Sequence, residues 1–236
     1  MLKTKQLKII SVSVFLVIEA LLQVLVQITS GETNDFVSYS VVALAAIFTL
    51  VCFERSKSYL LTQAATITTL FADLFLVVID PMIQLPAMIF FSGTQICYFL
   101  RLYFETNTKK ERQIHIVLRG ILTLTVLIFT LIVLKEKTDA LSMVSMFYYT
   151  NLIFNVVFAF IHFNKSKAFA FGLLLFLLCD TIIGLDIMAK SYITGEWIEA
   201  LNSLLSSMNW AWIFYVPSQA LIAISLIKFK NKKSST

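Results

Sequence analysis

Long apolar runs, separated by short polar segments, follow one another along the whole chain. A transmembrane helix needs about 20 predominantly apolar residues to cross the hydrocarbon core of a bilayer. Windows of that length predict eight membrane-spanning helices, over residues 9–28, 36–53, 58–80, 82–104, 114–134, 140–163, 168–189 and 205–227. The polar segments between them are too short to fold on their own, so we expect one integral membrane domain over residues 1–236.

Two of these boundaries depend on a few residues. The basic start of the chain resembles a signal peptide, but no small-residue cleavage site follows its apolar run, so we expect an uncleaved first helix. Only Asp80, Pro81 and Met82 separate the third and fourth runs. Because a proline pushes the preceding residue out of the helical region, we predict a tight turn at Asp80–Pro81.

The composition agrees with this pattern. Hydrophobic residues make up 58% of the chain and charged residues only 14%, and the mean hydropathy is +0.84. Soluble domains carry about 25% charged residues. The expected fold class is therefore all-α, a polytopic membrane protein with eight transmembrane helices.

The basic residues provide an independent test of the helix count. Sixteen of the nineteen fall on one side of the expected membrane, and only Lys135, Lys137 and Lys190 fall on the other. The positive-inside rule then places both termini in the cytoplasm, which requires an even number of spans in the cell membrane. The same loops explain the net charge of +5 through contact with anionic membrane lipids, so we expect no nucleic acid partner. The sixteen are Lys3, Lys5, Lys8, Arg55, Lys57, Arg101, Lys109, Lys110, Arg112, Arg119, Lys165, Lys167, Lys228, Lys230, Lys232 and Lys233.

Two aspartates, Asp73 and Asp180, lie deep inside otherwise apolar runs. A carboxylate at the centre of a bilayer costs at least ~2.5 kcal/mol, so it must face a partner or a wet cavity. Nothing in folding requires two separate helices to carry ionisable groups at one depth. We therefore interpret Asp73 and Asp180 as functional residues.

Further polar residues converge on the same depth, within roughly 8 Å of the expected midplane at a rise of ~1.5 Å per residue. Turned inward, they would enclose a substrate pocket, with Asp186 near its mouth. Such residues also often only hydrogen-bond neighbouring helices, for ~0.6 kcal/mol on average, and we favour that role for Gln23, Asn151 and Asn155. The candidate binding residues are Glu19, Gln95, Tyr98, Asn151, Tyr215, Gln219 and Asp186.

Absent motifs narrow the chemistry. The two histidines, His115 and His162, cannot build a three-histidine zinc site, and no HExxH, GxSxG, phosphate-binding or dinucleotide motif occurs. We expect no metal and no cofactor, which leaves acid/base work by carboxylates. Two carboxyl groups in one low-dielectric pocket cannot both ionise easily, so one should hold a proton.

The cysteines and tryptophans have structural roles in this interpretation. We expect Cys52, Cys97 and Cys179 to be buried thiols, and Trp197, Trp210 and Trp212 to belong to the aromatic belt at the membrane interface.

Four segments, TLFADLFLVV, IFFSGTQICYFLRLYF, AFGLLLFLLCDTIIGLD and WIFYVPSQALIAISL, resemble successive signatures of the YhhN-like lysoplasmalogenase family of eight-helix membrane proteins. The resemblance covers about 150 residues, and the order and spacing of the motifs carry it. The chain departs from the family pattern at four positions. Ala72 replaces a glycine, Gln95 a histidine, Cys179 a serine and Ser218 an alanine.

The resemblance implies a hydrolase that cleaves the vinyl-ether bond of a lysophospholipid substrate, releasing a fatty aldehyde and a glycerophospho-base. It matches Asp73 and Asp180 to the family's intramembrane aspartates, Tyr98 and Tyr215 to its tyrosines, and Gln219 to its final glutamine. One aspartate would serve as general acid and the other as general base. The alternatives are a small transporter or binding protein that uses the aspartates as proton or cation sites, and a structural or sensory scaffold.

Overall fold

The computed structural model describes residues 5–51, 56–79, 83–106, 108–191 and 208–227, and within these ranges the chain is all-helical. A π-helical segment, η1, continues α3, and a short 3-10 turn, η2, follows α5. The bounds are α1 (Lys5–Ile28), α2 (Glu32–Val51), α3 (Lys57–Asp73), η1 (Leu74–Ile79), α4 (Gln84–Glu105), α5 (Lys109–Leu134), η2 (Lys135–Lys137), α6 (Ala140–Ile161), α7 (Lys167–Ser191) and α9 (Trp210–Ile224).

Seven of the described helices are long and apolar enough to cross a membrane, counting α3 with η1 as one. They correspond to the first seven predicted spans. The eighth, predicted over 205–227, is shorter: α9 has 15 residues, about 22 Å of helix, against a hydrocarbon core of about 30 Å. Residues 205–207 lie outside the described ranges. At the other end, Ser225 is the C-cap of α9, and its N–H donates to the carbonyl oxygens of Leu221 and Ala223.

Polar capping residues set the start of two helices, and in one of them the helix begins before its apolar run. The predicted span at 114–134 begins five residues earlier, at Lys109, because the Thr108 side chain accepts the N–H of Glu111 at 3.2 Å. Asp139 caps α6 in the same way, accepting the N–H of Ser142 at 2.7 Å. An N-cap satisfies backbone donors that no helical carbonyl can reach, and it does so in polar sequence that hydropathy overlooks.

The turn between α1 and α2 depends on Gly31, whose φ of +61° suits a residue without a Cβ. Asn34, in the first turn of α2, donates from its side chain to the carbonyl oxygens of Val26 at 2.7 Å and Thr29 at 3.1 Å. These bonds satisfy carbonyl groups that the end of α1 leaves without helical partners.

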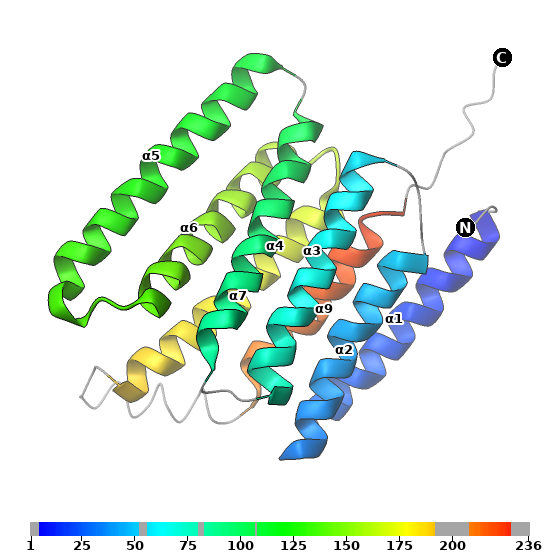
Figure 1. The fold of residues 1–236 in the computed structure, drawn as a ribbon. Coiled ribbons are helices and arrows are strands. Elements are labelled where there is room, and N and C mark those ends of the chain that lie inside the picture. Colours follow the sequence, from blue (N-terminus) through cyan, green and yellow to red (C-terminus); the bar gives the residue numbers. More distant parts are fainter. Residues whose placement is uncertain (1–4, 52–55, 80–82, 107, 192–207, 228–236) are drawn as a thin grey trace.

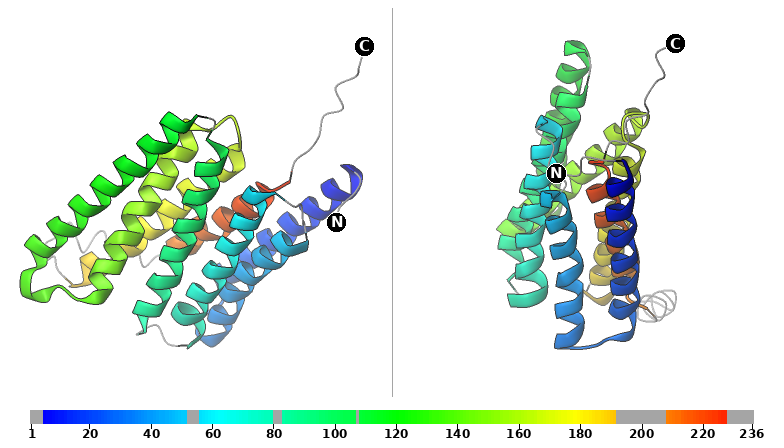
Figure 2. Two further views of the ribbon diagram at one scale, coloured as in Figure 1. Left: turned by 45° about the horizontal axis from the view of Figure 1, so that its top comes forward. Right: turned by 90° about the vertical axis from the view of Figure 1, so that its right-hand side faces the viewer.

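The helices form two layers (Figures 1 and 2). One layer contains α5, α4, α3 and α2 in that order, and the other contains α6, α7, α9 and α1. The closest helix contacts within the layers join α3 to α4 and α7 to α9, while α4 packs on α6 across the layers. The start of α1 and the end of α9 lie at the same end of the bundle, which we call the basic end; Val12 and Ile227 line one cavity there.

The contact between α7 and α9 is tightest at Gly172. A Cβ at this position would lie 2.7 Å from Cγ1 of Ile222 and 3.1 Å from the Ser218 carbonyl oxygen. Ser218 also donates its hydroxyl to the Gly172 carbonyl oxygen at 2.8 Å. Glycine at position 172 therefore lets the two backbones approach, and the Ser218 bond joins them.

Two residues counted among the basic loops are buried inside the bundle instead. Arg101 is buried near the end of α4, and Arg119 is buried in α5. Arg101 is held there by hydroxyl and carboxylate oxygens, and Arg119 by two asparagines. Fourteen basic residues remain as support for the orientation, so the cytoplasmic placement of both termini stays a prediction.

Candidate functional site

A cavity of about 570 Å³ lies at the end of the bundle where α4, α6 and α9 begin and α7 ends. We call it the aspartate cavity. Its walls are largely aliphatic and aromatic, and Asp73 and Asp180 are the charged residues among its described lining. The lining residues are Asp73, Leu76, Val77, Gln84, Met88, Phe91, Ser145, Met146, Tyr148, Tyr149, Cys179, Asp180, Thr181, Ile183, Gly184, Leu185, Ile187, Ala211, Trp212 and Tyr215.

Asp73 is the last residue of α3, where the helix passes into the π-helical segment η1. Its side chain is only 4% exposed, and its Oδ2 accepts the hydroxyl of Tyr215 from α9 at 2.5 Å. Leu76 and Val77, in the widened turn that follows, line the cavity beside it. Single π-helical turns within α-helices occur frequently at functional sites, and this one adjoins the carboxyl group directly.

Asp180 lies in α7 and forms a similar pair with α6. The hydroxyl of Tyr148 donates to Oδ2 of Asp180, and the neighbouring hydroxyls of Tyr149 and Thr181 are 2.8 Å apart. Asp180 is half-buried, more open than Asp73, while the free thiol of Cys179 beside it is buried. Each aspartate thus has one oxygen held by a tyrosine from a different helix.

Aromatic rings connect the two aspartate–tyrosine pairs. Phe91 packs against Tyr148 with ring centroids 5.5 Å apart, and against Phe176 at 6.0 Å. Phe176 in turn contacts Tyr215 at 5.4 Å, and Trp212 contacts Tyr215 at 5.3 Å. Both hydroxyl donors are therefore held by ring packing from α4, α7 and α9, which fixes their positions toward the carboxyl groups.

The two carboxyl groups line the same cavity. Among the residues that the structure describes, no three His, Cys, Asp or Glu side chains gather as a metal site would require. The chemistry that this arrangement supports directly is proton transfer by two carboxyl groups in an apolar enclosure.

Two predicted binding residues, Gln95 and Asn151, lie elsewhere, in a buried cluster around Arg119. The guanidinium donates through Nη1 to Oδ1 of Asn151 at 2.8 Å and through Nη2 to Oδ1 of Asn155 at 2.7 Å. Asn155 then donates to both the carbonyl oxygen and Oε1 of Gln95 at 2.9 Å. The guanidinium also lies 4.3 Å from the ring centroid of Phe99. We call these four polar residues the Arg119 network; it joins α4, α5 and α6, and none of its members lines the aspartate cavity.

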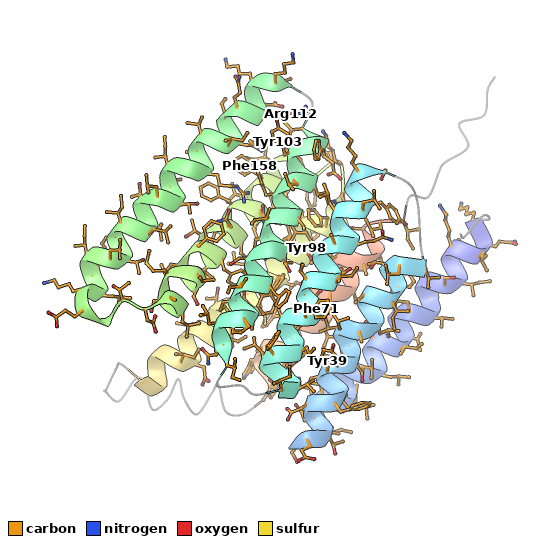
Figure 3. The ribbon with its side chains drawn as sticks, in the orientation of Figure 1. Tyr39, Phe71, Tyr98, Tyr103, Arg112 and Phe158 are labelled. Atoms are coloured by element: carbon orange, nitrogen blue, oxygen red, sulfur yellow. The ribbon has the colours of Figure 1, made fainter. Side chains whose placement is uncertain are left out.

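The other predicted binding residues occupy three more places. Tyr98 lies near the middle of the bundle (Figure 3), fully buried, with its ring edge-on to Phe169. Gln219, one turn beyond Tyr215 in α9, is buried with its Nε2 unpartnered. Glu19 is buried in α1, and neither of its carboxyl oxygens has a described partner. Asp186 is half-buried near the end of α7 and does not line the cavity, although its neighbours do.

The structure thus brings together Asp73, Asp180 and Tyr215 from the predicted set and adds residues that sequence reasoning missed. Tyr148 is the most important of these, and its position one helical turn before Asn151 was the available signal. Trp212 was assigned to the interfacial belt but packs against Tyr215 and lines the cavity. Trp197 lies outside the described residues.

Comparison with known proteins locates the chain in a family. Searches of curated proteins and of solved structures find no match. The family model described as the YhhN family matches residues 34–226, a range that includes both aspartates and both tyrosines of the cavity and leaves α1 outside. Because the match covers well over half of the chain, the protein belongs to the YhhN family.

Proposed function

We propose that the protein is a lysoplasmalogenase, an intramembrane hydrolase of the vinyl-ether bond of a lysophospholipid. One observation carries the proposal: two carboxyl groups, each held by a tyrosine hydroxyl, line one largely apolar cavity. Membership of the YhhN family is consistent with that activity. The reaction adds water across an enol ether, R–CH=CH–O–R′, to give the aldehyde R–CH₂–CHO and the alcohol HO–R′.

The first step requires an acid. Protonation of the alkene carbon that does not bear oxygen gives an oxocarbenium ion, and a positioned carboxylic acid supplies that proton. In both aspartates the tyrosine donates to Oδ2, which leaves Oδ1 to carry the transferable proton. An apolar enclosure strengthens this transfer because little water competes for the proton.

The second step requires a base and a negative charge. The remaining carboxylate stabilises the oxocarbenium ion electrostatically and accepts a proton from the water that attacks it. The hemiacetal formed in this way then breaks down to the aldehyde and the free glycerophospho-alcohol. We propose that Asp73 and Asp180 share these two roles, with one as the acid and the other as the base.

The cavity also suits a lipid chain. A volume of about 570 Å³ lies within the usual ~300–1,000 Å³ of small-molecule sites, and its aliphatic and aromatic lining matches a hydrocarbon chain. Ile183, Leu185 and Ile187 line the cavity and are exposed. A chain bound in the cavity therefore has a continuous apolar route to the surrounding lipid.

The test is aldehyde release by the purified protein from a vinyl-ether lysophospholipid, with the ester lysophospholipid of the same headgroup in parallel. We expect aldehyde from the vinyl ether only, and none from the Asp73→Asn/Asp180→Asn double variant. The matched control is Asp35→Asn, the same change at an exposed site in the first turn of α2. A folded wild-type protein that releases no aldehyde, or a double variant that keeps normal release, would refute the proposal.

A second candidate function has one observation in its favour. Helix irregularities lie next to both members of the Asp73–Tyr215 pair, since η1 follows Asp73 and Pro217 lies two residues beyond Tyr215 inside α9. Transporters bind substrates and ions at such interruptions. If the protein is a proton- or cation-coupled transporter, Asp73→Asn should abolish uptake into vesicles, and the wild type should release no aldehyde.

A further inference from the structure

A second cavity, of about 770 Å³, lies at the basic end of the bundle. We call it the basic cavity. Among the described residues, its lining includes three basic side chains, Arg101, Lys165 and Lys167, and the carboxylate of Glu105. Four serines, Ser56, Ser58, Ser166 and Ser225, add hydroxyl groups to the wall.

Arg101 is the deepest charged group of this cavity. It is 2% exposed, and its guanidinium lies 3.7 Å from the ring centroid of Phe169. Nη1 donates to the hydroxyls of Thr62 at 3.0 Å and Ser225 at 2.9 Å, and Nε donates to Glu105 at 3.2 Å. Nη2 has no hydrogen bond to a described residue, so the buried guanidinium keeps a donor for an acceptor in the cavity that it lines.

Glu105, the carboxylate of the described lining, is engaged at the cavity wall. Its Oε1 accepts both Arg101 and the Ser58 hydroxyl. The Lys165 ammonium contacts the backbone carbonyl oxygen of the same residue. Lys165 and Lys167 are exposed at the rim, where a mobile ammonium group can approach a ligand.

Two helices also begin at this cavity. Ser56 is the N-cap of α3, and Ser166 directly precedes the first residue of α7, Lys167. The first N–H groups of a helix have no helical acceptor, and the helix dipole adds partial positive charge there. A helix start is a weak feature alone, but here two of them adjoin a buried guanidinium with an unused donor.

We propose that the basic cavity is a binding site for a phosphate group. A tetrahedral anion with several acceptor oxygens matches the unused Nη2 of Arg101, two ammonium groups and hydroxyl donors. The site is separate from the aspartate cavity, because Phe91 and Arg101 are ten residues apart on α4, about 15 Å, with buried Gln95 and Tyr98 between them. The phosphate belongs either to an anionic phospholipid of the adjacent leaflet or to a soluble phosphate compound.

The experiment measures the unfolding temperature of the purified full-length protein in a neutral detergent, at constant ionic strength. One arm titrates inorganic phosphate, and the other titrates a short-chain phosphatidylglycerol against a short-chain neutral diacylglycerol. A ligand at free concentration L that binds only the folded state stabilises it by RT ln(1 + L/Kd), so the unfolding temperature rises with the logarithm of ligand concentration above Kd. A lipid site responds to the phosphatidylglycerol alone, and a soluble-phosphate site responds to both phosphate-bearing probes.

The variants decide whether the response comes from this cavity. Lys165→Gln/Lys167→Gln, which changes exposed residues, should shift the response to roughly tenfold higher probe concentration, the effect of losing charge-assisted hydrogen bonds. Lys109→Gln/Lys110→Gln removes the same charge from exposed residues outside the cavity and should respond like the wild type. No response of the wild type to either phosphate-bearing probe, or an equal response in both double variants, overturns the proposal. The proposal does not depend on the reaction at the aspartates.

Discussion

Two buried polar clusters in this bundle look alike in the sequence and differ in the structure. Both the aspartate cavity and the Arg119 network contain ionisable or amide side chains inside apolar helices. In the Arg119 network the guanidinium is bound to two asparagines from the next helix and covered by Phe99. In the aspartate cavity each carboxyl group has a tyrosine on one oxygen and faces open space. Polar groups bound to one another hold helices together, whereas polar groups facing a cavity are available to a substrate.

The largest effect should come from the single carboxyl variants. Asp73→Asn and Asp180→Asn keep shape and lose proton exchange, so aldehyde release should fall by about 10²–10⁴-fold. Because the tyrosine hydroxyl can still donate to the amide oxygen, the unfolding temperature should change little. Rates and melting curves on the same samples provide the check, and a variant that retains half of the wild-type rate removes that residue from the mechanism.

Arg119→Gln should produce the opposite pattern. It withdraws donors from Asn151 and Asn155 inside the bundle, and acceptors left unsatisfied there cost roughly 2–4 kcal/mol together. The rate per folded molecule should stay within about twofold of the wild type. Denaturant titration in mixed micelles measures the stability, and Lys110→Gln, at an exposed position of the same helix, is the matched control. A large loss of rate with unchanged stability would place Arg119 in the reaction.

The tyrosines should have intermediate effects. Tyr148→Phe and Tyr215→Phe each remove one hydrogen bond to a carboxyl group, worth ~1.5–3 kcal/mol, which corresponds to a rate loss of roughly 10–150-fold. The loss should depend on pH, because the hydroxyl acts on the protonation of its aspartate. Rate profiles across pH 5–9 test this expectation: a profile of unchanged shape would indicate that the tyrosine only packs.

Gln95→His should have the smallest effect. It restores the histidine that the family pattern carries at this position, but residue 95 belongs to the Arg119 network and not to the aspartate cavity. We expect the rate of aldehyde release to change by less than about threefold. A gain of tenfold or more would show that position 95 communicates with the cavity and would weaken the distinction between the two clusters.

Most of the fold could be predicted from the sequence because lipid imposes a strong constraint on helix length and composition. The first seven expected spans agree with described helices to within a few residues at each end. Errors arose where local polar groups decide the outcome. Thr108 extends α5 at its start, and α9 is shorter than the apolar content of 205–227 suggested. No feature of the sequence indicates the π-helical segment after Asp73.

The candidate site could be predicted only in part. The depth of a residue in the membrane can be read from the sequence, but the neighbour or cavity that its side chain faces cannot. Asp73, Asp180 and Tyr215 were placed at one depth and do line one cavity. Gln95 and Asn151 lie in the Arg119 network instead. Arg119, counted as a loop charge, is buried; it donates to Asn151 and Asn155, and Asn155 in turn binds Gln95. Tyr148 was missed because it stands between two other aromatic residues, Phe147 and Tyr149, and only its spacing to Asn151 distinguishes it.

The absence of a Cβ at Gly172 sets the distance between α7 and α9, and this distance affects the aspartate cavity. At this point α7, which carries Asp180, and α9, which carries Tyr215, approach as closely as their backbones allow. A methyl group there would push the two helices apart and so widen the gap between Asp180 and Tyr215, the partner of Asp73. The width of the aspartate cavity therefore depends on a residue some 12 Å from Asp180, eight residues along α7, that does not line the cavity.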